Sequence, residues 1–111
     1  MGQAIDKAEW AFYCERISHA LESVDAEVEV ESPELGDQQE TEWLPLIGIS
    51  YDPKDDIIDI ALEGIDHIIE HPQKFQVDGV PGVLRALAIT DEEGNRHLLR
   101  LRDALALPRP H

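Results

Sequence analysis

The sequence predicts an α+β domain, in which one N-terminal helix packs on an antiparallel sheet of about five strands. Apolar residues recur every three or four positions near the start of the chain, which is typical of a helix. Polar and apolar residues alternate in several later segments, and a glycine-containing turn joins two of these near the end, which is typical of strands. The length of 111 residues predicts a single domain over residues 1–111.

The helix is predicted from Lys7 to Val24. Asp6 is suited to cap it, and Glu9 follows three residues later, as in a capping box. Five apolar residues at spacings of three and four form one stripe along this segment, with Cys14 beside it. They are Trp10, Tyr13, Ile17, Leu21 and Val24.

The middle of the chain predicts three strands. Residues 26–31 alternate between valine and glutamate, which indicates a strand with one face in water. Residues 32–39 are polar and predict a loop. Residues 42–52 are apolar on both faces, so they predict a buried strand whose regular part begins after Pro45. Residues 57–63 then form the return strand after a proline-containing turn.

The segment 64–82 fits two interpretations. Its isoleucines form either one helical turn or a strand that continues past Gly64, and Pro72 disfavours helix at His71. The end of the chain is clearer. Residues 85–90 and 96–102 predict a hairpin, with a glycine in the turn between them to supply a positive φ.

The chain is strongly acidic, with 24 Asp and Glu against 9 Lys and Arg, a net charge of −15. A phosphate backbone is repelled by such a surface, so no nucleic-acid partner is expected. The charge favours solubility or a basic partner. It fits a well-solvated surface, a salt-adapted host or mimicry of nucleic acid.

Several absences narrow the classes of protein further. Cys14 is the single cysteine, which excludes an internal disulfide and a cysteine-based zinc site. There is no apolar run of about 18 residues, so no membrane partner is expected. The first ten residues lack the basic and then apolar pattern of a secretory signal. Together these features predict a cytoplasmic protein.

One motif suggests metal chemistry. Residues 67–71 read H-x-x-E-H, which matches the inverted zinc-peptidase motif. That chemistry needs both histidines on one face of a helix together with a third ligand, and Pro72 and Gly64 both work against such a helix. No metal is therefore expected. A weaker hypothesis remains, in which Asp66, His67 and His71 form a metal-dependent or catalytic site.

Two aromatic residues, Trp43 and Tyr51, are candidates for stacking on a ligand, although their alternation within a strand also fits core residues. Cys14 and His19 lie five residues apart, off one helical face, so a small buried cysteine is the simpler interpretation. The chain has no phosphate-binding loop and no nucleophile elbow. We therefore assign no catalytic residue and expect no cofactor.

Three segments carry a resemblance to a known family: 42–56 (EWLPLIGISYDPKDD), 61–67 (ALEGIDH) and 101–105 (LRDAL). They resemble a family of small bacterial proteins, of about the length of this chain, classed as a domain of unknown function. The likeness runs from Trp10 to Pro108. It implies a bacterial, stand-alone, single-domain protein, and it supplies no activity, cofactor or catalytic residue.

The leading hypothesis is a non-catalytic, acidic, cytoplasmic protein that binds a protein partner or self-associates as a homodimer. The alternative is a small enzyme or metal-dependent binder that uses Asp66, His67 and His71. Self-association is expected if the strand over residues 26–31 lies at a sheet edge, where it can pair with a second copy. The glutamates of this strand oppose such pairing if two copies place them together, and they permit it if they face the arginines of the last hairpin. These residues are Glu27, Glu29 and Glu31 on one side and Arg96, Arg100 and Arg102 on the other.

Overall fold

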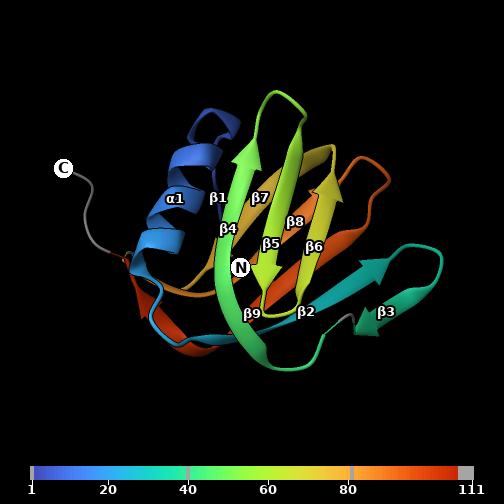
Figure 1. Ribbon diagram of the computed structural model, residues 1–111. Helices are drawn as coiled ribbons and strands as arrows, with labels where there is room; N and C mark the ends of the chain where they lie inside the picture. Colours follow the sequence, from blue (N-terminus) through green and yellow to red (C-terminus); the bar gives the residue numbers. More distant parts are fainter. Residues whose placement is uncertain (1, 40, 81, 108–111) are drawn as a thin grey trace.

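The computed structural model describes residues 2–39, 41–80 and 82–107. In this part of the chain, antiparallel strands accompany one short α-helix (Figure 1). The predicted helix on a sheet of about five strands is therefore wrong, because nine strands are present among the described residues. The elements are β1 (Gln3–Ala4), the 3-10 turn η1 (Lys7–Glu9), α1 (Trp10–Ala20), β2 (Asp25–Ser32), β3 (Gly36–Gln39), β4 (Leu44–Asp52), β5 (Ile57–Leu62), β6 (Ile65–Glu70), β7 (Pro72–Asp78), β8 (Val83–Asp91) and β9 (Arg96–Ala106).

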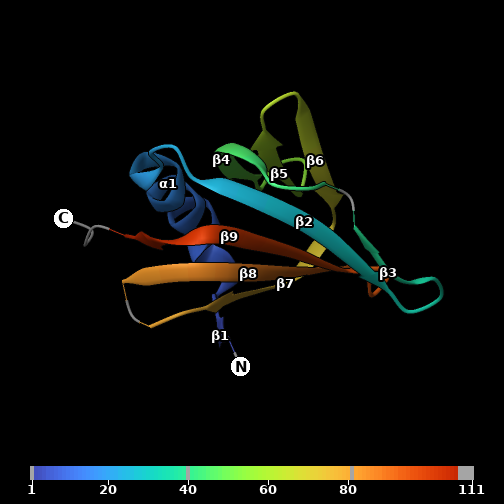
Figure 2. The same cartoon turned by 90° about the horizontal axis from the view of Figure 1, so that it is seen from below.

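The strands form two layers. Paired neighbours follow the order β1-β7-β8-β9-β2-β4-β5-β6, and β3 also pairs with β2. The strands β1, β7, β8, β9, β2 and β3 are termed the large sheet here, and β4, β5 and β6 the small sheet. β2 and β4 share only two residue pairs, Asp25 with Pro45 and Ala26 with Leu44, so β4 soon leaves the large sheet. Figure 2 shows the two layers from the side, with α1 next to them.

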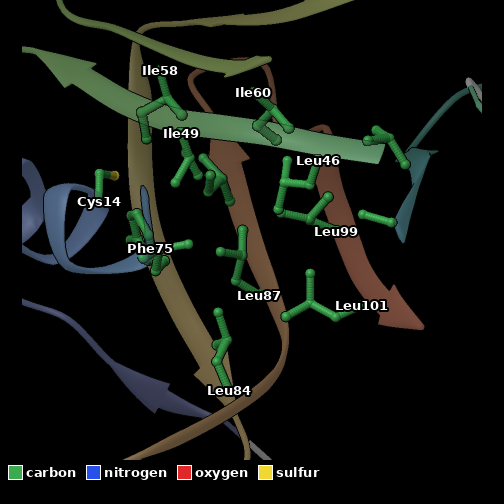
Figure 3. Packing of buried hydrophobic residues seen from close by; sticks show 14 of the residues in the cluster. Cys14, Leu46, Ile49, Ile58, Ile60, Phe75, Leu84, Leu87, Leu99 and Leu101 are labelled. Carbon is green, nitrogen blue, oxygen red and sulfur yellow. The ribbon is translucent and has the colours of Figure 1, made fainter. Parts of the chain in front are cut away.

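The hydrophobic core lies between the two layers. Alternate residues of the longer strands point into it, so Ile58 and Ile60 of the small sheet meet Leu87 and Leu99 of the large sheet (Figure 3). Each of these side chains is at most 2% exposed. Burying one such side chain contributes roughly 1.5–3 kcal/mol. Contact between the layers is therefore the main source of stability, and it fixes which face of the small sheet meets solvent.

The helix is shorter than predicted. α1 ends at Ala20, and Ser23 has a φ of +46°, which turns the chain toward β2. The carbonyl of Val24 accepts a hydrogen bond of 2.8 Å from the N–H of Leu46, so Val24 follows the sheet rather than the helix. Tertiary pairing thus overrides local propensity. The predicted cap also fails, since the Asp6 side chain makes no capping hydrogen bond.

α1 protects one edge of the small sheet. The Ser18 hydroxyl donates to the Ile49 carbonyl at 2.8 Å and accepts from the Ile49 N–H at 3.0 Å. These are main-chain groups of β4 that no strand satisfies after β2 has diverged. One serine on the helix therefore takes the place of a neighbouring strand at this point, and it shows that Ile49 turns its main-chain groups away from β5.

Two local predictions need correction, and the choice left open for residues 64–82 is decided in favour of strands. Residues 32–39 contain the strand β3 as well as a turn. β4 begins at Leu44 rather than after Pro45, and it has one wet face, with Ile47 62% exposed. Residues 64–82 hold two strands, β6 and β7, separated by His71 with a φ of +52°. That left-handed residue carries the chain from the small sheet to the large sheet, a role that no local pattern announces.

The predicted final hairpin is confirmed. Thr90 pairs with Arg96, and Gly94 has a φ of +86° in the turn between β8 and β9. The predicted strand over residues 26–31 is confirmed as β2, but it is not at an edge. It pairs with β9 along one side, and with β3 and β4 along the other.

The glutamates of β2 do face the arginines of the last hairpin, within one chain. Arg96 lies 2.8 Å from Glu31, and Arg100 lies 2.9 Å from Glu29. The series continues with Arg100 at 3.6 Å from Glu27 and Arg102 at 3.9 Å from Asp25. We term this set of cross-strand ion pairs the β2–β9 ladder. Each half-exposed pair contributes about 0.2–1 kcal/mol.

Candidate functional site

The outer edge of β6 is unpaired by any described residue, because β6 ends the order of strands. It pairs with β5 in one unbroken register over six residues. Ile65 and Ile68 are 45% and 46% exposed. Edge strands usually carry charged side chains, especially lysine, or proline or a bulge, which prevent pairing with other chains. β6 has no lysine, proline or bulge, and its charged side chains are those of Asp66 and Glu70. The free edge of β6 is therefore open to another strand.

Other edges in the described part of the chain are shortened, covered or polar. β1 has two residues, and β4 is bridged by Ser18. β3 has four residues, none with an apolar side chain. β6 differs from them in combining length, regular register and exposed isoleucine.

The residues of β6 that offer main-chain groups to a partner follow from the register. Ile49 turns its groups away from β5, its partner Ile60 turns them toward β6, and the next partner, His67, turns them toward β5. This orientation alternates along an antiparallel strand. Asp66, Ile68 and Glu70 therefore present their N–H and C=O groups at the free edge.

The same three residues place their side chains on the outer face of the small sheet. Asp59 of β5 lies directly opposite Ile68 in the register. Three carboxylates, those of Asp59, Asp66 and Glu70, thus surround one exposed isoleucine, and these four residues are termed the Ile68 patch. No described residue forms an ion pair or a hydrogen bond with these carboxylates, and β4, β5 and β6 contain no lysine or arginine.

Asp59 shows that the patch is electrostatically uncompensated. Its Oδ1 atom is buried and has no hydrogen-bond partner within the described part of the chain. Burial raises the pKa of Asp59, and the negative charge of Asp66 raises it further. A carboxylate in this state is stabilised by any N–H donor or cation that reaches it.

The inner face of β6 carries a buried polar chain. His67 Nε2 lies 2.9 Å from His97 Nδ1 on β9, and His97 Nε2 lies 2.9 Å from Asp91 Oδ2. A carboxylate only accepts, so His97 Nε2 donates to Asp91, and the tautomers of the two imidazole rings set the direction of the contact between His67 and His97. Burial by itself raises the pKa of Asp91, but hydrogen bonds from His97 and Asn95 outweigh burial and the pKa is lowered. This chain holds the edge strand to the large sheet.

His71 belongs to a different cluster, at the corner between the sheets. Its Nδ1 lies 3.5 Å from Asp56 Oδ2, while Tyr51 donates to Asp56 Oδ1 at 2.8 Å and Lys7 lies 3.5 Å away. The hydrogen bond from Tyr51 lowers the pKa of Asp56. Burial, followed by the contact with Asp56, raises the pKa of Tyr51 to about 12. Asp56 and His71 both have positive φ, so this cluster stabilises the corner.

The three residues of the metal hypothesis therefore diverge. Asp66 and His67 are neighbours on a strand, and their side chains point to opposite faces. His71 contacts Asp56 instead. Among the described residues, the one cluster with the geometry to hold a metal ion consists of Glu29, Glu31 and Asp37. Its glutamates are already engaged in the β2–β9 ladder.

The two aromatic candidates also lie apart. Tyr51 packs in the core against Trp10, with their ring centroids 5.2 Å apart. Trp43 is 40% exposed just before β4, and the Arg102 guanidinium lies 6.0 Å from its ring centroid. Cys14 is buried, and burial raises the pKa of its thiol to about 12, which disfavours a nucleophilic role.

The sequence analysis assigned no functional role to Asp59, Asp91 or His97. The alternation in β5 placed Asp59 on the outer face, but no pattern shows that its neighbours there are acids and an isoleucine from β6. Asp91 opens the turn of the last hairpin, and its Oδ1 accepts from the N–H groups of Glu93 and Asn95. That signal was present in the sequence, whereas its contact with His97 was not.

A hollow of about 500 Å³ lies between α1 and the β7–β8 loop. It exposes Phe12 and Val80. It contains none of the five residues that the sequence analysis singled out. A smaller cleft of about 270 Å³ is lined by His71 and His97, together with acids of β6 and of the β8–β9 turn.

The fold and this edge define a small, two-layered, mainly antiparallel β protein whose small sheet ends in a free strand. The chain belongs to the family of unknown function DUF5335, whose model matches residues 1–110, as the resemblance in its sequence predicted. It is 41% identical over 107 residues to an uncharacterized protein of Aquifex aeolicus (strain VF5), covering 96% of each chain. No solved structure matches. Within the described residues, no helix has the length and apolar character needed to cross a membrane.

Proposed function

We propose that the protein is a non-catalytic, acidic protein of the cytoplasm that binds another protein by adding a strand of that partner to β6. The free, regular and partly apolar edge of β6 carries this proposal. A cytoplasmic setting is supported by the free thiol of Cys14, since thiols persist in reducing compartments. The divergence of Asp66, His67 and His71 favours this hypothesis over the catalytic or metal-dependent alternative.

Strand addition supplies enough binding free energy for recognition. Three residues of β6 present both main-chain groups, so a partner strand forms about six hydrogen bonds with them. Each contributes about 0.5–1.5 kcal/mol net. Burial of the exposed part of Ile68 adds to this. The energy lies in main-chain pairing, which tolerates many partner sequences, and side chains supply selectivity.

A different protein is a better partner for β6 than a second copy. In the two-fold register that places Ile68 against Ile68, Asp66 of one copy faces Glu70 of the other. Like charges facing each other destabilise a strand pair, and each copy already carries a net charge of −15. The argument for self-association from residues 26–31 no longer holds, because β2 is paired on both sides.

Amide hydrogen exchange with short peptides tests the proposal. The probe alternates valine with threonine, so it is extended and uncharged. We expect it to slow exchange at the amides of Asp66, Ile68 and Glu70, and to leave the β8 amides unchanged. No protection at β6 with any extended peptide would refute the proposed function. Protection that instead grows with protein concentration alone would show that the partner is a second copy.

A proline variant supplies the matched control. Ile68→Pro removes an N–H that faces the free edge and leaves the hydrogen bonds to β5 in place, and edge strands tolerate such a change. Ile68→Val keeps both the N–H and the branched side chain. We expect the proline variant to lose peptide protection and the valine variant to keep it, with both melting close to the parent.

A further inference from the structure

The Ile68 patch and the β2–β9 ladder share one geometry. On β2, acids stand at alternate positions on one face, and β9 places arginines beside them. On β6, Asp66 and Glu70 likewise stand at alternate positions on one face, with Ile68 between them. The difference is that, among the described residues, β6 has a partner strand on one side only. β9 is therefore a template, within the same molecule, for the strand that complements β6.

The template includes an apolar position. On β9, Leu98 lies between Arg96 and Arg100 on the outer face, opposite Glu29. The patch on β6 reverses this order, with an apolar residue between two acids. The partner residue opposite Ile68 thus meets an apolar side chain first and the carboxylate of Asp59 behind it. A long methylene stem with a cationic tip satisfies both surfaces.

We infer that the strand added to β6 is an extended basic segment with lysine or arginine at alternate positions. The side chain opposite Ile68 lies across that isoleucine and donates to the carboxylate of Asp59 through the oxygen that is not buried. The side chains on either side pair with Asp66 and Glu70. This inference rests on the proposed function, since it names the chemistry of the strand that β6 accepts.

Charge in the rest of the small sheet supports the same partner. Its three strands hold the acids Asp52, Asp59, Asp66 and Glu70, and no lysine or arginine. An acidic or neutral segment gains main-chain hydrogen bonds at this edge but leaves the carboxylates uncompensated. A basic segment gains both, and its association is accelerated by the net charge of −15.

The test compares three peptides in which valine alternates with lysine, threonine or glutamate, each titrated calorimetrically at low and at moderate salt. We expect the lysine peptide to bind about tenfold more tightly than the threonine peptide at low salt, and to lose that advantage as salt rises. The glutamate peptide is expected to bind most weakly.

Matched variants assign the effect to the patch. Asp66→Asn combined with Glu70→Gln removes two charges from it, and Glu22→Gln combined with Glu34→Gln removes two exposed charges elsewhere. We expect the first pair to weaken the lysine peptide about tenfold and leave the threonine peptide unchanged, and the second pair to change neither. Equal binding of the lysine and threonine peptides, or equal losses in the two double variants, would overturn the inference.

The two proposals fail in different ways. If the threonine peptide protects the β6 amides and the lysine peptide binds no better, strand addition stands and the basic partner is wrong. If none of the three peptides protects those amides, both are wrong. Ile68→Lys provides a second check, because a lysine within the patch should abolish the preference for the lysine peptide while the strand remains folded.

Discussion

The strands β2 and β6 are both acidic at alternate positions, yet the fold gives their acids opposite surroundings. β2 lies inside the large sheet, and its acids form ion pairs with arginines of β9. The shortest of these, between Arg96 and Glu31, measures 2.8 Å. β6 lies at the edge of the small sheet, and Asp66 and Glu70 meet no described cation. The net charge of −15 therefore comprises two kinds of acidic surface. The acids of β2 are already neutralised within the fold, whereas those of β6 remain open to a partner.

The largest expected effect concerns the contact that joins β6 to the large sheet. His97→Ala removes the link between His67 on the edge strand and Asp91, and it leaves a cavity and two polar groups without this partner. We expect a loss of about 2–4 kcal/mol in the free energy of unfolding, measured by urea denaturation. A loss below about 1 kcal/mol would mean that β6 is held by apolar packing alone.

A smaller loss in the free energy of unfolding is expected when the acids of β2 lose a neutralising arginine. Arg100→Ala leaves Glu27 and Glu29 facing each other's charge without their shared cation, and we expect a cost of about 1 kcal/mol. Arg85→Ala, at an exposed position of β8, is the control and should change little. The cost of Arg100→Ala should shrink as salt increases. Equal effects of the two substitutions would remove the energetic distinction between β2 and β6.

The acids themselves should respond to pH with opposite signs. The pKa of Asp59 is raised in the folded state, so ionisation of Asp59 opposes folding above its ordinary value of 3.8. Asp59→Asn should stabilise the protein at pH 7 by a few tenths of a kcal/mol, and this gain should vanish in acid.

The pKa of Asp91 is lowered, so the contribution of Asp91 to stability is present above its ordinary value of 3.8 and is lost as pH falls below that value. Asp91→Asn should therefore destabilise at pH 7, and stabilisation by this substitution would contradict the assignment.

The last prediction has the smallest energetic effect, and it concerns the difference in dynamics between β6 and β2. In the free protein, amide exchange along β6 should alternate, fast at Asp66, Ile68 and Glu70 and slow at His67 and Ile69, because only the latter pair with β5. Exchange along β2 should be uniformly slow where β9 and β3 flank it. Nuclear magnetic resonance measures both in one experiment. Uniform protection of β6 would show that its edge is already occupied.

Local patterns in the sequence were informative where neighbours in space are also neighbours in the chain. The hairpin of β8 and β9 is closed by Gly94 and capped by Asp91, and all the necessary signals lie within a few residues. The alternation of β2 showed a wet acidic face. Family membership was likewise predicted from short segments of consecutive residues, because such segments can be recognised in the sequence without knowledge of the fold.

The errors arose where distant segments compete with local preference. Helical periodicity extended to Val24, but the carbonyl of Val24 accepts a hydrogen bond from the N–H of Leu46, which places it beside a strand. The isoleucines after Gly64 fitted helix or strand equally, and pairing with β5 decided the matter. The motif at His67 and His71 suggested one site, whereas a left-handed φ at His71 sends the two side chains to different partners.

The sequence by itself determined that the protein is acidic, that several of its segments alternate as strands, and that its chain belongs to a family of small proteins. Only the tertiary structure decided that β2 has neighbours on both sides and β6 on one. Strand order depends on hydrogen bonds between residues far apart in the chain, such as Glu29 and Leu98, whose pairing leaves no trace in the local pattern of either segment. Whether an acidic strand is neutralised or free to bind therefore follows from its place in the sheet.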